Sequence, residues 1–195
     1  MKKILAFAAL ALMLPAASYA QMSSEANVGL SLGFATNDTG LYFLGKEKID
    51  WGSGVGVGLN AEYLVKPCDS FYVGLGLEYT NLGEEETTIG YNKLETTISS
   101  YGAFLASRLN LPIENNKFYV PFGVGYGKSK AENKFNGDKE NYSDGGLTYY
   151  VGLGMAFEKW NLELRYSSYP KIEIENLKTK NLNTVNVLAK YRFSL

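Results

Sequence analysis

The sequence predicts an all-β protein, an eight-stranded antiparallel up-and-down β-barrel that crosses a membrane. Three observations lead to this fold class. Apolar residues alternate with glycine and small polar residues in eight separate segments, and such a period of two is typical of strands. Long polar connections alternate with short ones, and the chain begins with an export signal. An even number of strands with short turns at one end and long loops at the other is typical of transmembrane barrels.

Residues 1–20 have the features of a secretory signal peptide. Lys2 and Lys3 precede an apolar run from Ile4 to Leu14, and a small-residue end follows Pro15. This run is too short to span a bilayer, and no later segment has the roughly 20 apolar residues that a spanning helix needs. We therefore expect residues 21–195 to form one exported barrel domain.

The first predicted strand is Asn27–Ala35, and the clearest alternation follows between Gly54 and Leu82. Both arms of this hairpin carry valine, leucine and aromatic residues on one face and mostly glycine on the other. A soluble sheet would present bulky polar side chains on its second face. An apolar face turned to lipid and a glycine face turned into a narrow barrel explain both features together.

Five further segments continue the alternation, and each is about as long as the 9 to 11 residues that a tilted strand needs to cross the hydrocarbon. They are residues 96–111, 118–128, 147–157, 160–167 and 183–195. Phe104 interrupts the pattern because it lies on the polar side of its strand. Pro121 cannot donate to a ladder, which predicts a bulge there.

The connections between these strands predict four long extracellular loops and three short periplasmic turns. The long loops are expected at residues 37–53, 83–94, 129–146 and 169–182. The short turns are expected at residues 66–70, 112–117 and 158–159.

Aromatic residues on the apolar faces fall into two groups when the strands are placed in an up-and-down barrel. At the short-turn end lie Tyr63, Phe71, Phe118, Phe157, Trp160, Tyr191 and Phe193. At the long-loop end lie Phe34, Tyr79, Tyr101, Tyr126, Tyr149 and Tyr166. Two aromatic girdles around an aliphatic band are typical of a membrane barrel with an interface on each side.

The inward faces carry charges of both signs. They are Glu62, Glu78, Glu163, Arg108, Arg165, Lys190 and Arg192. Isolated buried charges are costly, so we expect this interleaved set to neutralise itself and to plug the lumen, either as structural filling or as parts of a gate. Tyr72, Tyr119 and Tyr150 are expected to lie over neighbouring glycines and to fill the remaining space.

The composition argues against catalysis, metal binding and nucleic-acid binding. After removal of the signal, 17 basic groups face 20 acidic ones, which gives no reason to expect nucleic-acid binding. The chain has one cysteine, Cys68, so no intrachain disulfide can form, and it has no histidine to act as a general base. The glycines near Gly52 precede no helix that could bind phosphate, and loop 129–146 lacks calcium-loop spacing. We expect no catalytic residues, no cofactor and no metal.

The whole pattern resembles the small eight-stranded outer-membrane barrels of the OmpA/OmpX type, the outer-membrane protein β-barrel or porin family. The final strand, VNVLAKYRF, is similar to the aromatic C-terminal signal that the barrel assembly machinery recognises in that family, with Tyr191 and Phe193 as the signal residues. Ser194 and Leu195 depart from the family's usual aromatic terminus. The resemblance implies a monomer in the bacterial outer membrane, in contact with lipid and lipopolysaccharide. Enzymatic outer-membrane barrels depend on histidine, so it implies no enzyme.

Two functions remain open at this point. One is a structural or surface-interaction role through the long loops, especially Asn37–Ser53 and Lys130–Gly145, which would contact lipopolysaccharide, host surfaces or other partners. The other is a narrow, porin-like channel for small solutes or ions. A soluble, lipocalin-like binding barrel is disfavoured because such a barrel has no reason to sort aromatic residues by height.

Overall fold

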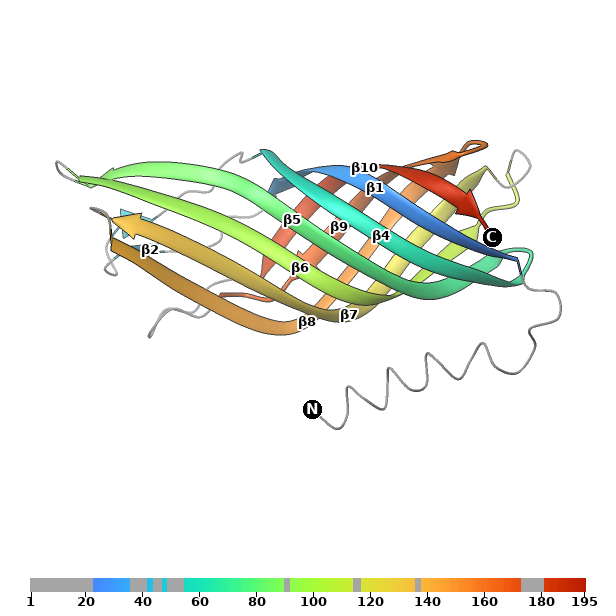
Figure 1. Ribbon diagram of the computed structural model, residues 1–195, viewed down its shortest axis with the longest axis horizontal. Helices are drawn as coiled ribbons and strands as arrows, with labels where there is room; N and C mark the ends of the chain where they lie inside the picture. The colour runs from blue at the N-terminus through green and yellow to red at the C-terminus, as the bar shows by residue number, and fades with distance from the viewer. Residues whose placement is uncertain are drawn as a thin grey trace.

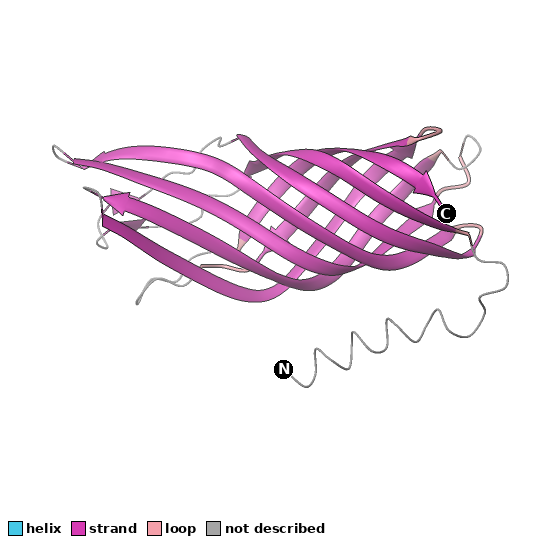
Figure 2. Cartoon of the chain, viewed as in Figure 1, coloured by secondary structure: helices cyan, strands magenta, loops and turns pink. Residues whose placement is uncertain are grey.

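A closed barrel of antiparallel strands forms the body of the protein, here described from a computed structural model (Figure 1). The structure describes residues 23–35, 42–43, 47–48, 55–89, 92–113, 117–135, 138–172 and 181–195. The regular elements in these ranges are all strands, as Figure 2 shows. No helix in them is long and apolar enough to cross a bilayer. The predicted signal peptide lies outside the described residues.

Eight strands make up the barrel, which confirms the predicted fold class. They are β1 (Ser24–Ala35), β4 (Val55–Cys68), β5 (Phe71–Ile89), β6 (Asn92–Asn110), β7 (Phe118–Phe135), β8 (Asp138–Ala156), β9 (Trp160–Tyr169) and β10 (Leu182–Ser194). Each strand pairs with its sequence neighbour, and β1 closes the barrel by pairing with both β4 and β10. Leu30, for example, lies between Leu59 and Ala189.

Inward and outward residues alternate as the period of two predicts. Leu30, Leu77 and Leu147 are 61–69% exposed on the outer wall, whereas Asn60 and Thr148 are at most 3% exposed inside. This arrangement is the inverse of a soluble protein, and it fits a barrel whose outer surface is solvated by lipid. Phe104 is buried inside, as its place on the polar face predicted.

The predicted aromatic girdles face outward at both ends. Tyr79 lies directly opposite Tyr101 at one end of the wall. At the other end Trp160 pairs with Tyr191, with ring centroids 5.2 Å apart, and Tyr191 packs against Phe193 at 4.8 Å. Every predicted girdle residue is partly or fully exposed. The height of the barrel in a bilayer is therefore set by side chains that the sequence pattern identified.

Two of the predicted long loops are wrong, because strands occupy most of them. β5 and β6 stay paired out to Ile89 and Asn92, and β7 and β8 out to Phe135 and Asp138. These extensions lie beyond the outer girdle, so neither of their faces contacts lipid. Their sequences therefore do not need the alternation of apolar residues that is typical of a membrane strand. In Figure 1 the two hairpins project from the barrel at the end opposite the C-terminus. We call the paired parts beyond the girdle the projecting sheet (residues 83–89, 92–99, 129–135 and 138–145).

A bulge marks the place where β5 leaves the barrel wall. Pairing of β5 with β4 ends at Asn81, and the register with β6 shifts between Asn81 and Glu84. Gly83 lies at this shift with a φ of 85°, a left-handed conformation that favours glycine, and its N–H donates to the Asn81 side chain at 2.8 Å.

Other connections differ in smaller ways from the prediction. The first long loop contains a short two-stranded sheet of β2 (Tyr42–Phe43) and β3 (Glu47–Lys48). The bulge expected at Pro121 is absent, since the register between β7 and β8 is the same on both sides of it. An irregularity appears instead at the turn between β4 and β5, where the register shifts between Val65 and Cys68. Cys68 is exposed in this turn.

Candidate functional site

Arg165 lies at the centre of a charge cluster inside the barrel. Its guanidinium is fully buried and meets carboxylates from three strands. Nη1 lies 2.9 Å from Glu78 on β5, and Nη2 lies 2.9 Å from Glu62 on β4 and 2.5 Å from Glu163 on β9. One planar cation thus ties together the walls on opposite sides of the closed strand order, because a guanidinium presents donors in several directions.

Lys190 on β10 adds the second cation of this central cluster. Its Nζ lies 2.7 Å from Glu62 and 2.5 Å from Glu163. Three carboxylates and two cations leave one formal negative charge in excess. Two tyrosine hydroxyls face that excess: Tyr119 donates to Glu163 at 2.9 Å, and Tyr169 donates to Glu78.

All six carboxylate oxygens of the central cluster therefore have a donor. The face of the Tyr150 ring also lies 3.8 Å from the guanidinium carbon of Arg165, which is favourable for a desolvated cation. Burying charges requires this degree of pairing, because each unpaired buried ion carries a penalty of several kcal/mol.

A second cluster lies nearer the short turns and joins Arg108 to Glu25. Arg108 Nη1 lies 2.7 Å from a Glu25 oxygen, and its guanidinium carbon lies 4.0 Å from the centre of the Tyr72 ring. Asn27 also donates to Glu25 at 3.1 Å and accepts from Asn161 at 3.0 Å. Arg108 is thus separate from the central cluster, and Tyr119 lies between the two, with its ring 4.9 Å from Arg108 and its hydroxyl on Glu163.

The predicted lumen charges are therefore divided among three places. Glu62, Glu78, Glu163, Arg165 and Lys190 lie together in the central cluster, and Arg108 pairs with Glu25. Arg192 lies at the short-turn end, where it donates to the carbonyls of Phe157 and Glu158 at 2.8 and 2.6 Å. It comes no closer than 4.0 Å to Glu25 and is partly exposed.

The sequence did not predict two side chains of these clusters, Glu25 and Tyr169. Glu25 precedes the predicted first strand, but β1 begins at Ser24 and carries it into the barrel. Tyr169 falls in the predicted fourth loop, yet it ends β9 and is buried. The signal that could have located Tyr169 is the apolar content of Tyr169, Pro170 and Ile172 at the start of an otherwise polar segment.

The glycines of the inner face make room for the tyrosine rings. A Cβ added to Gly154 would lie 2.3 Å from the Tyr119 ring, and one added to Gly123 would lie 2.5 Å from the Tyr150 ring. The prediction that Tyr119 and Tyr150 lie over glycines is therefore confirmed. Tyr72 instead lies against the guanidinium of Arg108.

Apolar side chains gather in the barrel above the central cluster, toward the projecting sheet. They include Leu82, Ile98, Ala131, Tyr169, Ile172 and Leu182. The end of β9 and the residues that follow it turn in toward this group: Thr148 on β8 donates to the carbonyl of Ser168 in β9 at 2.7 Å, and Ser129 on β7 donates to the Pro170 carbonyl at 2.9 Å. Residues 169–172, predicted as loop, thus line the mouth of the barrel.

The outer surface of the projecting sheet carries ion pairs of a different kind. Lys134 lies 3.8 Å from Glu84 and 3.6 Å from Glu95, and Glu132 lies 3.3 Å from Lys130 and 3.6 Å from Lys139. All of these side chains are 28–60% exposed. The hydrogen bond from Lys130 lowers the pKa of the Glu132 carboxyl.

The projecting sheet also has two open edges among the described residues. β4 pairs with β5 only up to Asn81, and β9 pairs with β8 only from Tyr149 onward. Within the part of the chain that the structure describes, β5 beyond Asn81 and β8 before Tyr149 therefore have a strand neighbour on one side only.

A closed barrel with an apolar outer wall, aromatic girdles and paired charges inside defines the class of this protein as a membrane-spanning β-barrel. The chain belongs to the outer membrane protein beta-barrel domain family, whose model matches residues 6–193. No curated protein matches the sequence at a significant level.

Solved structures support the same fold. Ail, the attachment invasion locus protein of Yersinia pestis, is similar with a TM-score of 0.56 and 16% identity over 89% of this chain and 99% of Ail. Ail in complex with the heparin analogue sucrose octasulfate gives a TM-score of 0.55 and 18% identity, with the same shares covered. The N-terminal barrel domain of Pseudomonas aeruginosa OprF gives 0.50 and 11% identity over 89% of this chain and 100% of that domain. At these identities the likeness shows the fold alone.

Proposed function

We propose that this protein is a non-enzymatic outer-membrane barrel that acts at the cell surface through its projecting sheet. The observation that carries the proposal is the continuation of β5–β8 beyond the outer girdle as a sheet whose two edges have no strand neighbour among the described residues. Open edges present unpaired N–H and C=O groups, which an extended segment of another protein can pair with. The predicted loop at residues 37–53 would add to the same surface.

The barrel itself is proposed to be closed to solutes. The central cluster pairs its charges across the lumen, and the apolar group at the mouth lies above it. Eight strands leave an interior only wide enough for side chains, so filling of this kind leaves little room for a water path. These contacts favour a structural role for Glu62, Glu78, Glu163, Arg165 and Lys190 over a conducting gate.

Export and assembly complete the proposal. Residues 1–20 would direct secretion, and Tyr191 and Phe193 would present the signal read by the barrel assembly machinery. The outward position of Phe193 on the last strand fits such a role. The mature protein would reside as a monomer in contact with lipid and lipopolysaccharide.

The surface partner is proposed to be something other than a polyanion. Ail is described in complex with a heparin analogue, but the lysines of this chain's projecting sheet alternate with Glu84, Glu95 and Glu132 in ion pairs. A surface of mixed charge gives little net attraction to a sulfated chain.

Trimming the projecting hairpins tests the surface role. One variant replaces residues 131–142 by Asn-Gly, which joins β7 and β8 by a tight turn between Lys130 and Ser143, a pair that lies opposite in the sheet. A matched variant replaces residues 85–96 between the paired Glu84 and Thr97. We expect bacteria producing either variant to adhere less to epithelial monolayers than bacteria producing the full protein.

Heat-modifiable gel migration of each variant checks that the barrel is intact, since a closed barrel resists detergent until it is boiled. Equal adhesion of the full and trimmed proteins, both with intact barrels, would contradict the proposed role. So would adhesion by the full protein no greater than that of cells lacking it.

A further inference from the structure

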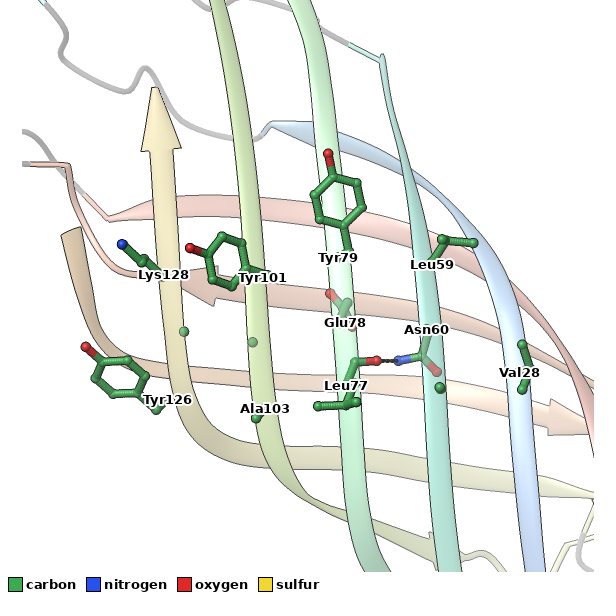
Figure 3. A pocket seen from close by; sticks show the side chains of 13 residues that line it. Val28, Leu59, Asn60, Leu77, Glu78, Tyr79, Tyr101, Ala103, Tyr126 and Lys128 are labelled. Carbon is green, nitrogen blue, oxygen red and sulfur yellow. Dashed lines mark hydrogen bonds between the residues drawn. The ribbon is translucent and has the colours of Figure 1, made fainter. Parts of the chain in front are cut away.

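A groove runs across the outer wall just below the outer girdle. It has a volume of about 590 Å³ and is formed by β4, β5, β6 and β7, with Val28 of β1 at one end (Figure 3). This volume falls within the range of about 300–1,000 Å³ that is typical of sites for small molecules. The groove lies outside the projecting sheet, and Glu78, whose carboxylate belongs to the central cluster, is among the residues that line it.

Two rows of outward side chains explain the shape of the groove. The upper row, at the height of the girdle, runs from Leu59 through Tyr79 and Tyr101 to Lys128, each opposite the next on the neighbouring strand. The lower row, nearer the middle of the membrane, consists of Ala61, Leu77, Ala103 and Tyr126. The two alanines are too short to fill the wall between larger neighbours, so a hollow forms beneath the tyrosines.

The Tyr126 side chain does not fill the hollow, which therefore stays open beside β7. A Cβ added to Gly145 on β8 would lie 2.3 Å from the Tyr126 hydroxyl, which shows that this ring leans toward β8 and away from Ala103. The side chains that remain are almost wholly apolar. The groove therefore has the shape and polarity to hold a hydrocarbon chain lying along the wall.

Lys128 gives the groove a charged end. It lies on the outward face of β7 opposite Tyr101, and Figure 3 shows the Tyr101 hydroxyl turned toward Lys128, whose amine points away from the Tyr101 ring. Lys130 and Lys134 on the same face are engaged by carboxylates, but Lys128 has no ion-pair partner among the described residues. An unpaired cation at the height of an aromatic girdle lies where lipid head groups carry their phosphates.

We propose that this groove binds a phosphorylated glycolipid of the outer leaflet, the lipopolysaccharide anchor, with one acyl chain over Ala61 and Ala103 and a phosphate on Lys128. The outer leaflet is assigned because the groove is lined by Tyr79 and Tyr101, which belong to the girdle at the end opposite the short turns. The Tyr101 hydroxyl would be a second donor to the head group. This site rests on the membrane placement of the barrel and is independent of the surface role proposed for the projecting sheet.

Native mass spectrometry of the detergent-solubilised barrel, titrated with lipid, tests the site. The probes are bis-phosphorylated lipid A, its dephosphorylated form and phosphatidylglycerol. The variants are Lys128→Gln, which removes the charge, and Ala103→Leu, which fills the groove. Their matched controls are Lys134→Gln, a paired lysine on the same strand, and Ala189→Leu, an outward alanine on β10 away from the groove.

We expect one bis-phosphorylated lipid A to remain bound to the wild type. Lys128→Gln should weaken its binding about fivefold, the size expected for one lysine near a membrane surface. Ala103→Leu should weaken binding of all acylated probes at this site, and both controls should behave as the wild type. The dephosphorylated lipid should bind the wild type no more tightly than lipid A binds the Lys128→Gln variant.

Wild-type affinity in both Lys128→Gln and Ala103→Leu would overturn the proposal. Equal affinity for phosphatidylglycerol and lipid A would also overturn it, because the groove would then be an ordinary phospholipid contact. A protein dimer that Ala103→Leu dissociates would assign the groove to a second copy of the chain. Both variants alter the lipid-facing wall alone, and heat-modifiable migration confirms that each barrel is closed.

Discussion

The central cluster and the projecting sheet use the same residue types in opposite settings. Inside the barrel, Arg165 and Lys190 are at most 2% exposed and meet carboxylates at 2.5–2.9 Å. Outside, Lys130, Lys134 and Lys139 meet carboxylates at 3.3–3.8 Å and stay largely in water. Removing one partner of a buried pair strands a charge, whereas an exposed pair contributes little. Position in the barrel, rather than charge, therefore decides how much each ion pair contributes to stability.

The largest effect is expected from Arg165→Met. This change leaves Glu62, Glu78 and Glu163 buried with Lys190 as their sole remaining cation, and should lower the free energy of unfolding by about 3–5 kcal/mol. Urea titration of the protein in lipid vesicles, followed by tryptophan fluorescence, measures it. A loss no larger than that of Lys134→Ala would show that the cluster is solvated and would remove the contrast between the two regions.

The pair of Arg108 and Glu25 should show strong coupling. Arg108→Met and Glu25→Gln are each expected to destabilise the barrel, and the double variant should lose less than the sum, with a coupling energy of about 1–3 kcal/mol. The same urea titrations of the single and double variants provide the thermodynamic cycle. Strict additivity would mean that the two side chains do not interact in the membrane.

A methyl group on Gly154 should be disruptive although it adds no charge. The new Cβ would lie 2.3 Å from the Tyr119 ring, so the ring must shift and its hydroxyl must leave Glu163. Gly154→Ala is expected to cost about 1–3 kcal/mol, as overpacking usually does. Gly146→Ala is the matched control, because its Cβ would make only ordinary contacts of 3.6 Å with Pro170. Equal stability of the two variants would argue against the placement of Tyr119.

A much smaller effect is expected from Lys134→Ala on the projecting sheet. Its pairs with Glu84 and Glu95 are long and exposed, so the free energy of unfolding should change by about 0.5 kcal/mol or less. Urea titration of Lys134→Ala and Arg165→Met under identical conditions compares the two changes in the free energy of unfolding. A change as large as 2 kcal/mol, on the order of a buried pair, would mean that the sheet's charges support the fold.

The smallest effect concerns the periplasmic turn and its pH dependence. A hydrogen bond from Lys66 at 2.9 Å lowers the pKa of Asp69 below its ordinary value of 3.8. The contribution of Asp69 is therefore present above pH 3.8 and is lost as the pH falls through the lowered pKa. The thermal midpoints of the wild type and of Asp69→Asn should differ only slightly, and this difference should be the same at neutral and at mildly acidic pH. A difference that changes between these conditions would contradict the assignment.

The sequence predicted those parts of the molecule that the bilayer constrains. Period two located the outward leucines and inward glycines because lipid and lumen impose opposite demands on successive residues, and the girdles followed from the heights of Tyr79, Tyr101 and Trp160. The extensions of β5–β8 were missed because they lie beyond the outer girdle, where lipid no longer requires an apolar residue at every second position, although Ile98 and Ala131 at their base face the buried apolar group.

The lumen was predicted less completely than the wall. The alternation of residues predicted which side chains point inward, so the inward charges were identified. Which of these charges form pairs depends on the stagger between strands, and an alternation within one strand does not reveal that stagger. Arg108 therefore seemed part of one set with Glu62, although its partner is Glu25. Tyr169 was missed because it lies at the end of β9, where the chain turns inward after the alternation stops.

If the paired charges and the apolar group close the barrel, as we propose, the wild-type protein should not conduct ions. Single-channel recording in planar bilayers tests it most directly. We expect no steady unitary currents from the wild type at any applied voltage, and currents only when Arg165 or Glu78 is replaced by a small residue. Steady wild-type currents that are lost on changing Arg108 or Glu78 would contradict it, because those residues would then line a path for ions.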